Sequence, residues 1–375
     1  MSLKLFGSYR LGSYAEIAGT CLLWGLIIWG GMAGWHFIQV GRQIGQLKDP
    51  DPATRAHAAG QLAKHPSSRA VQPLLDALND TDFNVADSAV QALGASKDAR
   101  AVQPLIAGLK DSSSTRYSHA ADALGDLGAL AVPSLVAALH DPDIGLQEGS
   151  RQALTKAGKP AVDSLIALLS DPDPRLREDA ADTLGQIKDA RAVDPLVNLL
   201  HSPDENLRAT AAEALGAISD KRALDPLIAA MQQDPAATVK INAAEALGAL
   251  RDKRADQPLI AAVQSKDPAI ATAATRSIGQ IDDSQAEEFL MGQFAARNLD
   301  VIADASTFFI KKGKSGSEDV LIQALNKTGN SSLAQDMLNC GNAKLHDAAT
   351  DWAAKNGYEV TYNAGAKTAS WGSGW

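Results

Sequence analysis

The feature that most constrains this chain is an internal repeat with a period of about 31 residues. Residues 101–106 (Ala-Val-Gln-Pro-Leu-Ile) resemble residues 192–197 (Ala-Val-Asp-Pro-Leu-Val), and the sequence Ala-Glu-Ala-Leu-Gly occurs at 212–216 and again at 244–248. A unit this short cannot bury a core alone, so successive units are expected to stack into a solenoid. The units begin at Ala70, Ala101, Ala131, Ala161, Ala192, Ala223, Ala255, Ala286 and Ser317.

Each unit is predicted to form two helices. In the unit that begins at Ala192, the first apolar face has helical spacing, and residues 201–204 then break the pattern. Gly216 lies near the end of the second helix, where a left-handed glycine can terminate it. The two apolar faces comprise Val193, Leu196, Val197 and Leu200 in the first helix, and Leu207, Ala211, Ala214 and Leu215 in the second.

The turns also repeat. Asp-Pro at the inner turn predicts a helix stop, because the residue before proline disfavours helix; it occurs at 141–142, 171–172, 234–235 and 267–268. At the outer turn, Asp189, Asp220 and Asp252 are placed to cap the following helix. The second-helix cations Arg177, Arg208 and Lys240 are expected to pair with acids of a neighbouring unit.

Composition agrees with an all-α fold. Only 5% of the 375 residues are aromatic, so small aliphatic residues must carry the core, which favours closely packed helices. The formal charge of -9 argues against nucleic acid as a partner. We predict an α-solenoid of about eight to nine helical hairpins over residues 49–357.

The repeated pattern resembles the HEAT-like repeats of the phycobilisome-lyase type. It consists of Ala-Val-x-Pro-Leu-Ile, then Asp-Pro-Asp, then Leu-Arg-x-x-Ala-Ala-x-Ala-Leu-Gly, and covers roughly residues 49–316. The resemblance implies the fold but only loosely a function, because such families include chromophore lyases, hydroxylases, adaptors and scaffolds.

The ends of the stack depart from the pattern. Residues 49–66 are expected to form a capping half repeat, with a helix from Thr54 to Lys64, and Leu345–Gly357 a last helix. Phenylalanine replaces small residues near the C-terminal end of the stack, as expected for a terminal repeat that caps the core. The Gly- and Ser-rich tail, 358–375, carries Trp371 and Trp375, which we expect to bind a partner protein, with the chain's own terminal repeats as the alternative site. The phenylalanines are Phe289, Phe294, Phe308 and Phe309.

The N-terminal region is expected to anchor the chain in a membrane. After the segment 1–16, residues 17–41 carry no formal charge, and this run is long enough to span a bilayer as one helix. Gly30 and Gly34 form a small-xxx-small pair that would let another helix pack closely. The positive charges before and after this run nearly balance, so they do not predict on which side of the membrane the solenoid lies.

No pattern of catalytic residues is present in the sequence. None of the seven histidines is followed by glutamate, the pair that marks the metal hydroxylases of the resembled family. Gly313-Lys314-Ser315 lacks the rest of a phosphate loop. Cys21 and Cys340 suggest neither a zinc site nor a disulfide. We therefore expect no catalytic, cofactor-binding or metal-binding residues.

The strongest candidate surface is acidic. Asp122, Asp182, Glu213 and Glu245 occupy one recurrent position of the second helices, where they would suit a basic partner, although a merely solvated face explains them too. His119 lies on a second helix and is a weaker candidate.

These features favour a non-catalytic scaffold or accessory subunit of a membrane protein complex, in contact with the lipid bilayer and with protein partners. Two alternatives are a bilin chromophore lyase or isomerase, and a membrane-anchored assembly factor that binds its client transiently.

Overall fold

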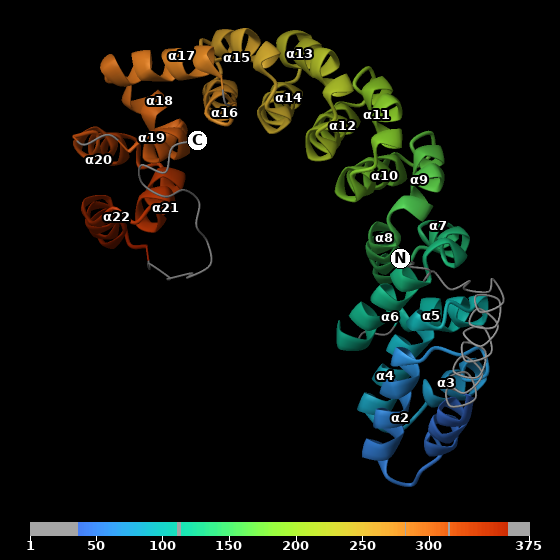
Figure 1. Ribbon diagram of the computed structural model, residues 1–375. Coiled ribbons are helices and arrows are strands. Elements are labelled where there is room, and N and C mark those ends of the chain that lie inside the picture. Colours follow the sequence, from blue (N-terminus) through green and yellow to red (C-terminus); the bar gives the residue numbers. More distant parts are fainter. Residues whose placement is uncertain (1–36, 111–113, 282, 314–315, 359–375) are drawn as a thin grey trace, which may run out of the picture. The chain divides into compact units, whose positions relative to one another are not determined.

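The computed structural model describes residues 37–110, 114–281, 283–313 and 316–358. Within these ranges every regular element is a helix, which confirms the all-α solenoid of helical hairpins (Figure 1). The chain forms two compact units, the first ending at Ala161 and the second beginning at Val162.

Unit 1 begins, in its described part, with helical residues 37–46 and the capping helix α2. Short first helices (α3, α5, α7) then alternate with longer second helices (α4, α6, α8), and a 3-10 turn precedes most first helices. The bounds are α2 Pro52–Lys64, α3 Val71–Ala77, α4 Phe83–Ala95, η1 Ala99–Ala101, α5 Val102–Gly108, α6 Ser114–Leu127, η2 Gly128–Leu130, α7 Val132–Ala138, α8 Ile144–Ala157 and η3 Lys159–Ala161.

Unit 2 continues the alternation and then becomes irregular. Second helices α10, α12, α14 and α16 pack side by side, and the first helices form a separate row (Figure 1). The bounds are α9 Val162–Leu168, α10 Pro174–Ile187, η4 Ala190–Ala192, α11 Val193–Leu199, α12 Glu205–Ile218, η5 Lys221–Ala223, α13 Leu224–Gln233, α14 Ala237–Leu250, η6 Lys253–Ala255, α15 Asp256–Ala262, α16 Pro268–Ile278, α17 Ser284–Ala295, α18 Leu299–Asp304, α19 Ser306–Lys312, α20 Glu318–Thr328, α21 Ser331–Asn339 and α22 Ala343–Lys355.

The predicted start of each repeat is a buried position. All nine starting residues, from Ala70 to Ser317, are at most 8% exposed. The apolar faces predicted for the unit at Ala192 are confirmed except at Val197, which is half-buried; Val193, Leu196 and Leu215 are fully buried.

Aspartates cap the 3-10 turn and the second helix of a repeat. At the outer turn, Asp189, Asp220 and Asp252 each accept a hydrogen bond from the amide two residues later and so cap η4, η5 and η6. The first α-helix that follows each turn has no side-chain cap, so the predicted capping applies to the 3-10 turn. At the inner turn, Asp204 accepts from the amides of Asn206 and Leu207 and so begins α12. These carboxylates satisfy the amides that a helix N-terminus leaves unpaired.

The dipeptide Asp267-Pro268 acts differently from the predicted helix stop. Asp267 is the N-cap of α16 and Pro268 its first residue, a position where proline's fixed φ and missing N–H cost nothing. It therefore starts a second helix, whereas Asp141-Pro142 and Asp171-Pro172 precede the capping residue of theirs.

Gly216 also has a different role from the predicted one. It lies inside α12, and Ser219 is the residue that takes the left-handed conformation at the helix end (φ 59). A Cβ on Gly216 would lie 2.8 Å from the Cα of Ala246 in α14. The glycine is needed because two second helices cross there with no room for a side chain.

The C-terminal part of unit 2 is held by aromatic and carboxylate contacts. Phe309 packs against Phe294 and edge-on against Phe308, and Phe308 and Phe309 are buried, consistent with the atypical end predicted from the sequence. Asp336 is buried and accepts hydrogen bonds from Ser306 and Thr307, about one repeat earlier in the chain. The expected last helix is present as α22.

The expected membrane location is contradicted. Over residues 37–358, gaps excluded, no helix is both long and apolar enough to cross a bilayer. The described end of the expected span, 37–41, belongs to a helix that continues past Arg42 to Gln46. Val40 is buried and Arg69 lies over the Phe37 ring at 4.0 Å, whereas the Phe37 and Ile38 side chains remain exposed.

Other N- and C-terminal features fall outside the described residues. They include the segment 1–16, most of the expected span 17–41 with its pair Gly30 and Gly34, and the tail after Tyr358 with Trp371 and Trp375.

Candidate protein-binding surface

The acidic row predicted on the second helices exists in unit 2. Asp182, Glu213 and Glu245 each lie three residues before the glycine at which neighbouring second helices cross. Helices packed in this way lie about 8–10 Å apart, so the three carboxylates, from α10, α12 and α14, follow one another at about that interval. The row is thus a direct product of the repeat.

The three acids differ in their surroundings. Glu213 is exposed. Glu245 is 49% exposed and lies 3.4 Å from Arg276 of α16, which ends the row with a positive charge. Asp182 is half-buried and accepts a hydrogen bond from Gln186, one turn later on α10.

Glu178 extends the acidic character of α10. It lies one turn before Asp182 and is partly buried. Burial raises the pKa of Glu178, and the nearby carboxylates of Asp204 and Asp179 raise it further. Three carboxylates therefore lie near one another where α10 and the start of α12 meet, with Arg177 opposing their effect on the pKa of Glu178.

The fourth predicted acid, Asp122, belongs to unit 1. It forms a salt bridge with Lys156 at 3.0 Å, and the same ammonium contacts Asp126 at 3.2 Å. Lys156 therefore offsets the acidic charge here, and the acidic row that is continuous in the structure is the one in unit 2.

His119 pairs with a neighbouring second helix. Its Nδ1 contacts the carboxylate of Asp87, which lies on α4, while His119 lies on α6. The imidazole is one-third exposed. This contact joins two repeats and gives His119 a structural role.

The first-helix face of unit 2 carries a different charge pattern. Arg191 and Arg222 each bridge the capping aspartate of their own turn and an aspartate of the previous first helix, Asp163 or Asp194. Aspartates and arginines alternate along this edge, whereas the row on α10, α12 and α14 consists of negatively charged residues.

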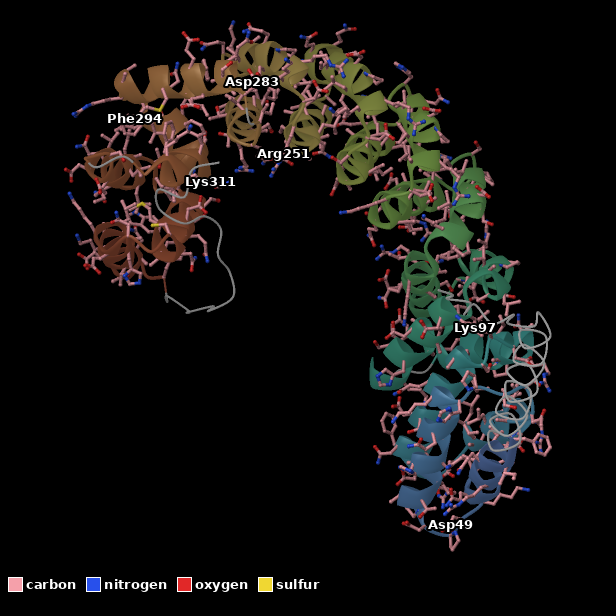
Figure 2. The ribbon with its side chains drawn as sticks, in the orientation of Figure 1. Asp49, Lys97, Arg251, Asp283, Phe294 and Lys311 are labelled. Carbon is pink, nitrogen blue, oxygen red and sulfur yellow. The ribbon has the colours of Figure 1, made fainter. Side chains whose placement is uncertain are left out.

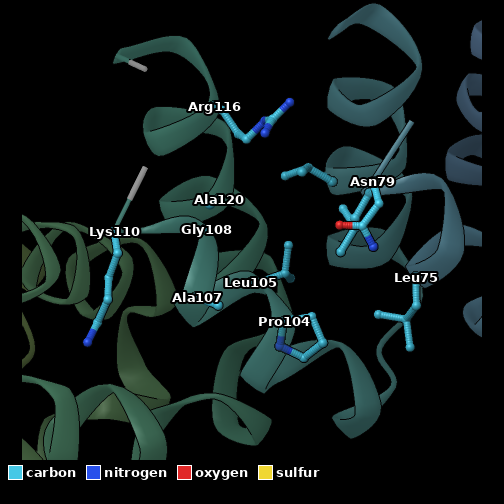
Figure 3. A pocket seen from close by; sticks show the side chains of 11 residues that line it. Leu75, Asn79, Pro104, Leu105, Ala107, Gly108, Lys110, Arg116 and Ala120 are labelled. Atoms are coloured by element: carbon cyan, nitrogen blue, oxygen red, sulfur yellow. The ribbon is translucent and has the colours of Figure 1, made fainter. Parts of the chain in front are cut away.

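Open grooves lie between consecutive first helices. One, of about 520 Å³, separates α3 from α5 and has a largely apolar lining. Figure 3 shows Arg116 and Asn79 at its sides and Lys110 pointing away. A similar groove of about 630 Å³ lies between α11 and α13. The first is lined by Leu75, Leu78, Asn79, Val90, Pro104, Leu105, Ala107, Gly108, Lys110, Arg116 and Ala120.

The described residues hold no cluster of His, Cys, Asp or Glu that could bind a metal ion. Cys340 is buried, burial raises the pKa of its thiol, and its Sγ donates to the carbonyl of Met337. A buried, protonated thiol is a poor nucleophile, so Cys340 acts as a core residue.

The repeats identify the family. The sequence pattern of HEAT repeats matches residues 44–125, 162–248 and 224–308, which together cover more than half of the chain. The chain belongs to the HEAT repeat family. HEAT repeats stack helical hairpins into solenoids, in agreement with the geometry above. No curated protein matches the sequence significantly.

Several solved structures resemble this HEAT repeat chain at low identity. Human deoxyhypusine hydroxylase is 22% identical over 68% of this chain and 98% of its own, with a TM-score of 0.31. The complex of CpcE and CpcF of phycocyanin lyase from Nostoc sp. PCC7120 is 21% identical over 66% and 91%, with a TM-score of 0.27. Kap121p bound to Ste12p is 13% identical over 80% and 44%, with a TM-score of 0.47. These similarities concern the fold alone.

Proposed function

We propose that this HEAT repeat protein is a non-catalytic scaffold that holds a basic segment of a partner protein along the second-helix face of unit 2. The observation that supports this function is the row of Asp182, Glu213 and Glu245, one carboxylate per repeat on successive helices.

The interval between these acids fits an extended peptide. Alternate residues of an extended chain lie about 6.5–7 Å apart and point to the same side, and the flexible side chains of lysine and arginine can reach the remaining distance of roughly 1–3 Å. Arg276 sets the end of the row, because it would repel a cation placed beyond Glu245. The expected partner is therefore an extended lysine- or arginine-rich segment that crosses three repeats.

A pair of matched triple variants tests this proposal. One neutralises the row with Asp182→Asn, Glu213→Gln and Glu245→Gln. The control neutralises Asp163, Asp194 and Asp225, three exposed acids on the first helices of the same unit. Both change the net charge by the same amount, so a loss of binding in the row variant alone cannot come from the total charge.

Co-purification from the native cells, followed by quantitative mass spectrometry, is the measurement. We expect the row variant to lose basic partners that the wild-type chain and the control both retain. Retention of every partner by the row variant would refute the proposed surface, and transfer of a bilin pigment by the purified chain would refute the non-catalytic hypothesis.

A further inference from the structure

Asp256 occupies a position that is apolar in the six repeats before it. It is the first residue of α15, directly after the repeat start Ala255, and its side chain is fully buried (0% exposed). The preceding repeats place an aliphatic residue here, and each is buried: Val71, Val102, Val132, Val162, Val193 and Leu224. A carboxyl group has thus replaced a core aliphatic side chain.

The described structure supplies no hydrogen-bond donor for either carboxylate oxygen of Asp256. The carboxyl of another acid, Asp283, lies within hydrogen-bonding reach of Asp256. Asp283, labelled in Figure 2, caps the N-terminus of α17, where it accepts a hydrogen bond from the amide of Gln285. Two carboxylates cannot bond to each other unless one of them carries a proton.

The other charged group that acts on Asp256 is also an acid. Asp252 lies at the turn before η6, and its carboxylate is bonded to Arg254, which lowers its pKa and keeps it ionised. Arg254 is therefore engaged by Asp252. Burial, together with Asp283 and Asp252, raises the pKa of Asp256 to about 6.

We propose that Asp256 and Asp283 form a proton-operated latch between α15 and α17. With one proton, the Asp256 carboxyl donates a hydrogen bond to Asp283 and the two helices stay together. With both groups ionised, a buried charge and a like-charge contact oppose the packing, and the start of α17 separates from α15.

The direction of the pH effect follows from linkage. A carboxyl whose folded pKa is raised from 3.8 to about 6 binds its proton more tightly when the latch is closed. Closure is therefore most favourable at pH values below 3.8 and loses this contribution as pH rises through about 6. Between about pH 5 and about pH 7.5 the closing equilibrium should weaken by about tenfold.

Hydrogen exchange of the full-length chain tests the latch. Amides of residues 257–262 and 284–291 should lose about tenfold in protection between about pH 5 and about pH 7.5, after correction for intrinsic exchange rates. Residues of α11 and α12 in the same molecules serve as the internal reference and should not change. Protection that is independent of pH at 257–262 and 284–291 would overturn the proposal.

Two variants assign the effect to these side chains. Asp256→Val restores the residue found in the sister repeats and should give high protection at both pH values. Asp283→Asn removes the like charge, so the pH dependence should shrink. A comparable pH dependence that survives in Asp256→Val would refute the latch. If that variant failed to fold, carboxyl ¹³C NMR of the wild-type chain would decide, because a titration midpoint near the ordinary value of 3.8 for Asp256 contradicts the latch and one near 6 supports it.

Discussion

Arg208 of α12 donates two hydrogen bonds to the carboxylate of Asp234, which lies 26 residues later at the end of α13. The Nε–Oδ2 distance is 2.7 Å and the Nη2–Oδ1 distance is 3.0 Å. Both side chains are largely buried, at 11% and 6% exposed. Arg55 and Asp80 make the same contact between α2 and the end of α3.

This buried pair should be costly to break from one side. Arg208→Met leaves the Asp234 carboxylate buried without its cation, and we expect the free energy of unfolding to fall by about 3 kcal/mol. Arg175→Met is the control, because Arg175 is 69% exposed and its pair with Asp173 should be worth less than about 1 kcal/mol. Urea unfolding measures both. Equal losses in the two variants would contradict the special role of the buried pair.

The crossing at Gly216 should tolerate no side chain. Gly216→Ala places a methyl group 2.8 Å from both Cα and Cβ of Ala246, so α12 and α14 must move apart at a cost of about 1–3 kcal/mol. A Cβ added at Gly60, inside α2, would meet no atom within 4 Å, and Gly60→Ala should stabilise the chain by up to about 1 kcal/mol. Thermal unfolding of the two variants should therefore shift in opposite directions.

Acid should weaken the outer turn of unit 1. The hydrogen bonds from Arg100 hold the pKa of Asp98 at about 2, below its ordinary value of 3.8. Asp98 thus contributes stability above pH 3.8 and loses it as pH falls towards 2. The loss should be about 1–2 kcal/mol, since the Arg100 partner is half exposed. Asp98→Asn should flatten the stability profile over this interval. Asp76→Asn, which removes an exposed carboxylate of α3, should leave the slope as in the wild-type chain.

Single changes to alanine at four histidines and one cysteine should leave partner binding intact if the chain is a scaffold. Disrupting the core should abolish partner binding. Leu215 is fully buried, and Leu215→Asp would bury an unpaired charge at a cost of several kcal/mol. Co-purification and circular dichroism together separate the two cases. Loss of function in a folded histidine variant would point to catalysis instead. The positions to be changed to alanine in this test are His57, His119, His140, His201 and Cys340.

The repeat boundaries could be predicted because each one satisfies several local requirements at once. A small buried residue, a capping aspartate and an apolar helical period coincide at Ala192 and again at Ala223. The pairing of Arg208 with the next repeat followed from the same periodicity and is confirmed.

The sequence repeat does not predict contacts that depend on how closely two helices approach each other. Glycine is ambiguous in sequence, because a helix end and a close crossing both require it, and only the position of Ala246 decides for Gly216. Arg177 shows the same limit, since it bonds to carbonyls of its own turn instead of an acid in the next repeat. Asp256 differs in this respect, because its alignment with the buried Val193 and Leu224 is already visible in the repeat, and the structure adds that the carboxyl stays buried.

The crossings between second helices also make the array interchangeable by whole repeats. Gly185 faces Ala214 just as Gly216 faces Ala246, and Asp189 and Asp220 cap their turns in the same way. Excising residues 190–220 would join Asp189 to Lys221 and bring Gly185 opposite Ala246. Every junction would then resemble one that already exists, so a loss or duplication of one whole repeat changes the reach of the protein, whereas a shorter deletion would disrupt the repeat in which it falls and its contacts with both neighbours.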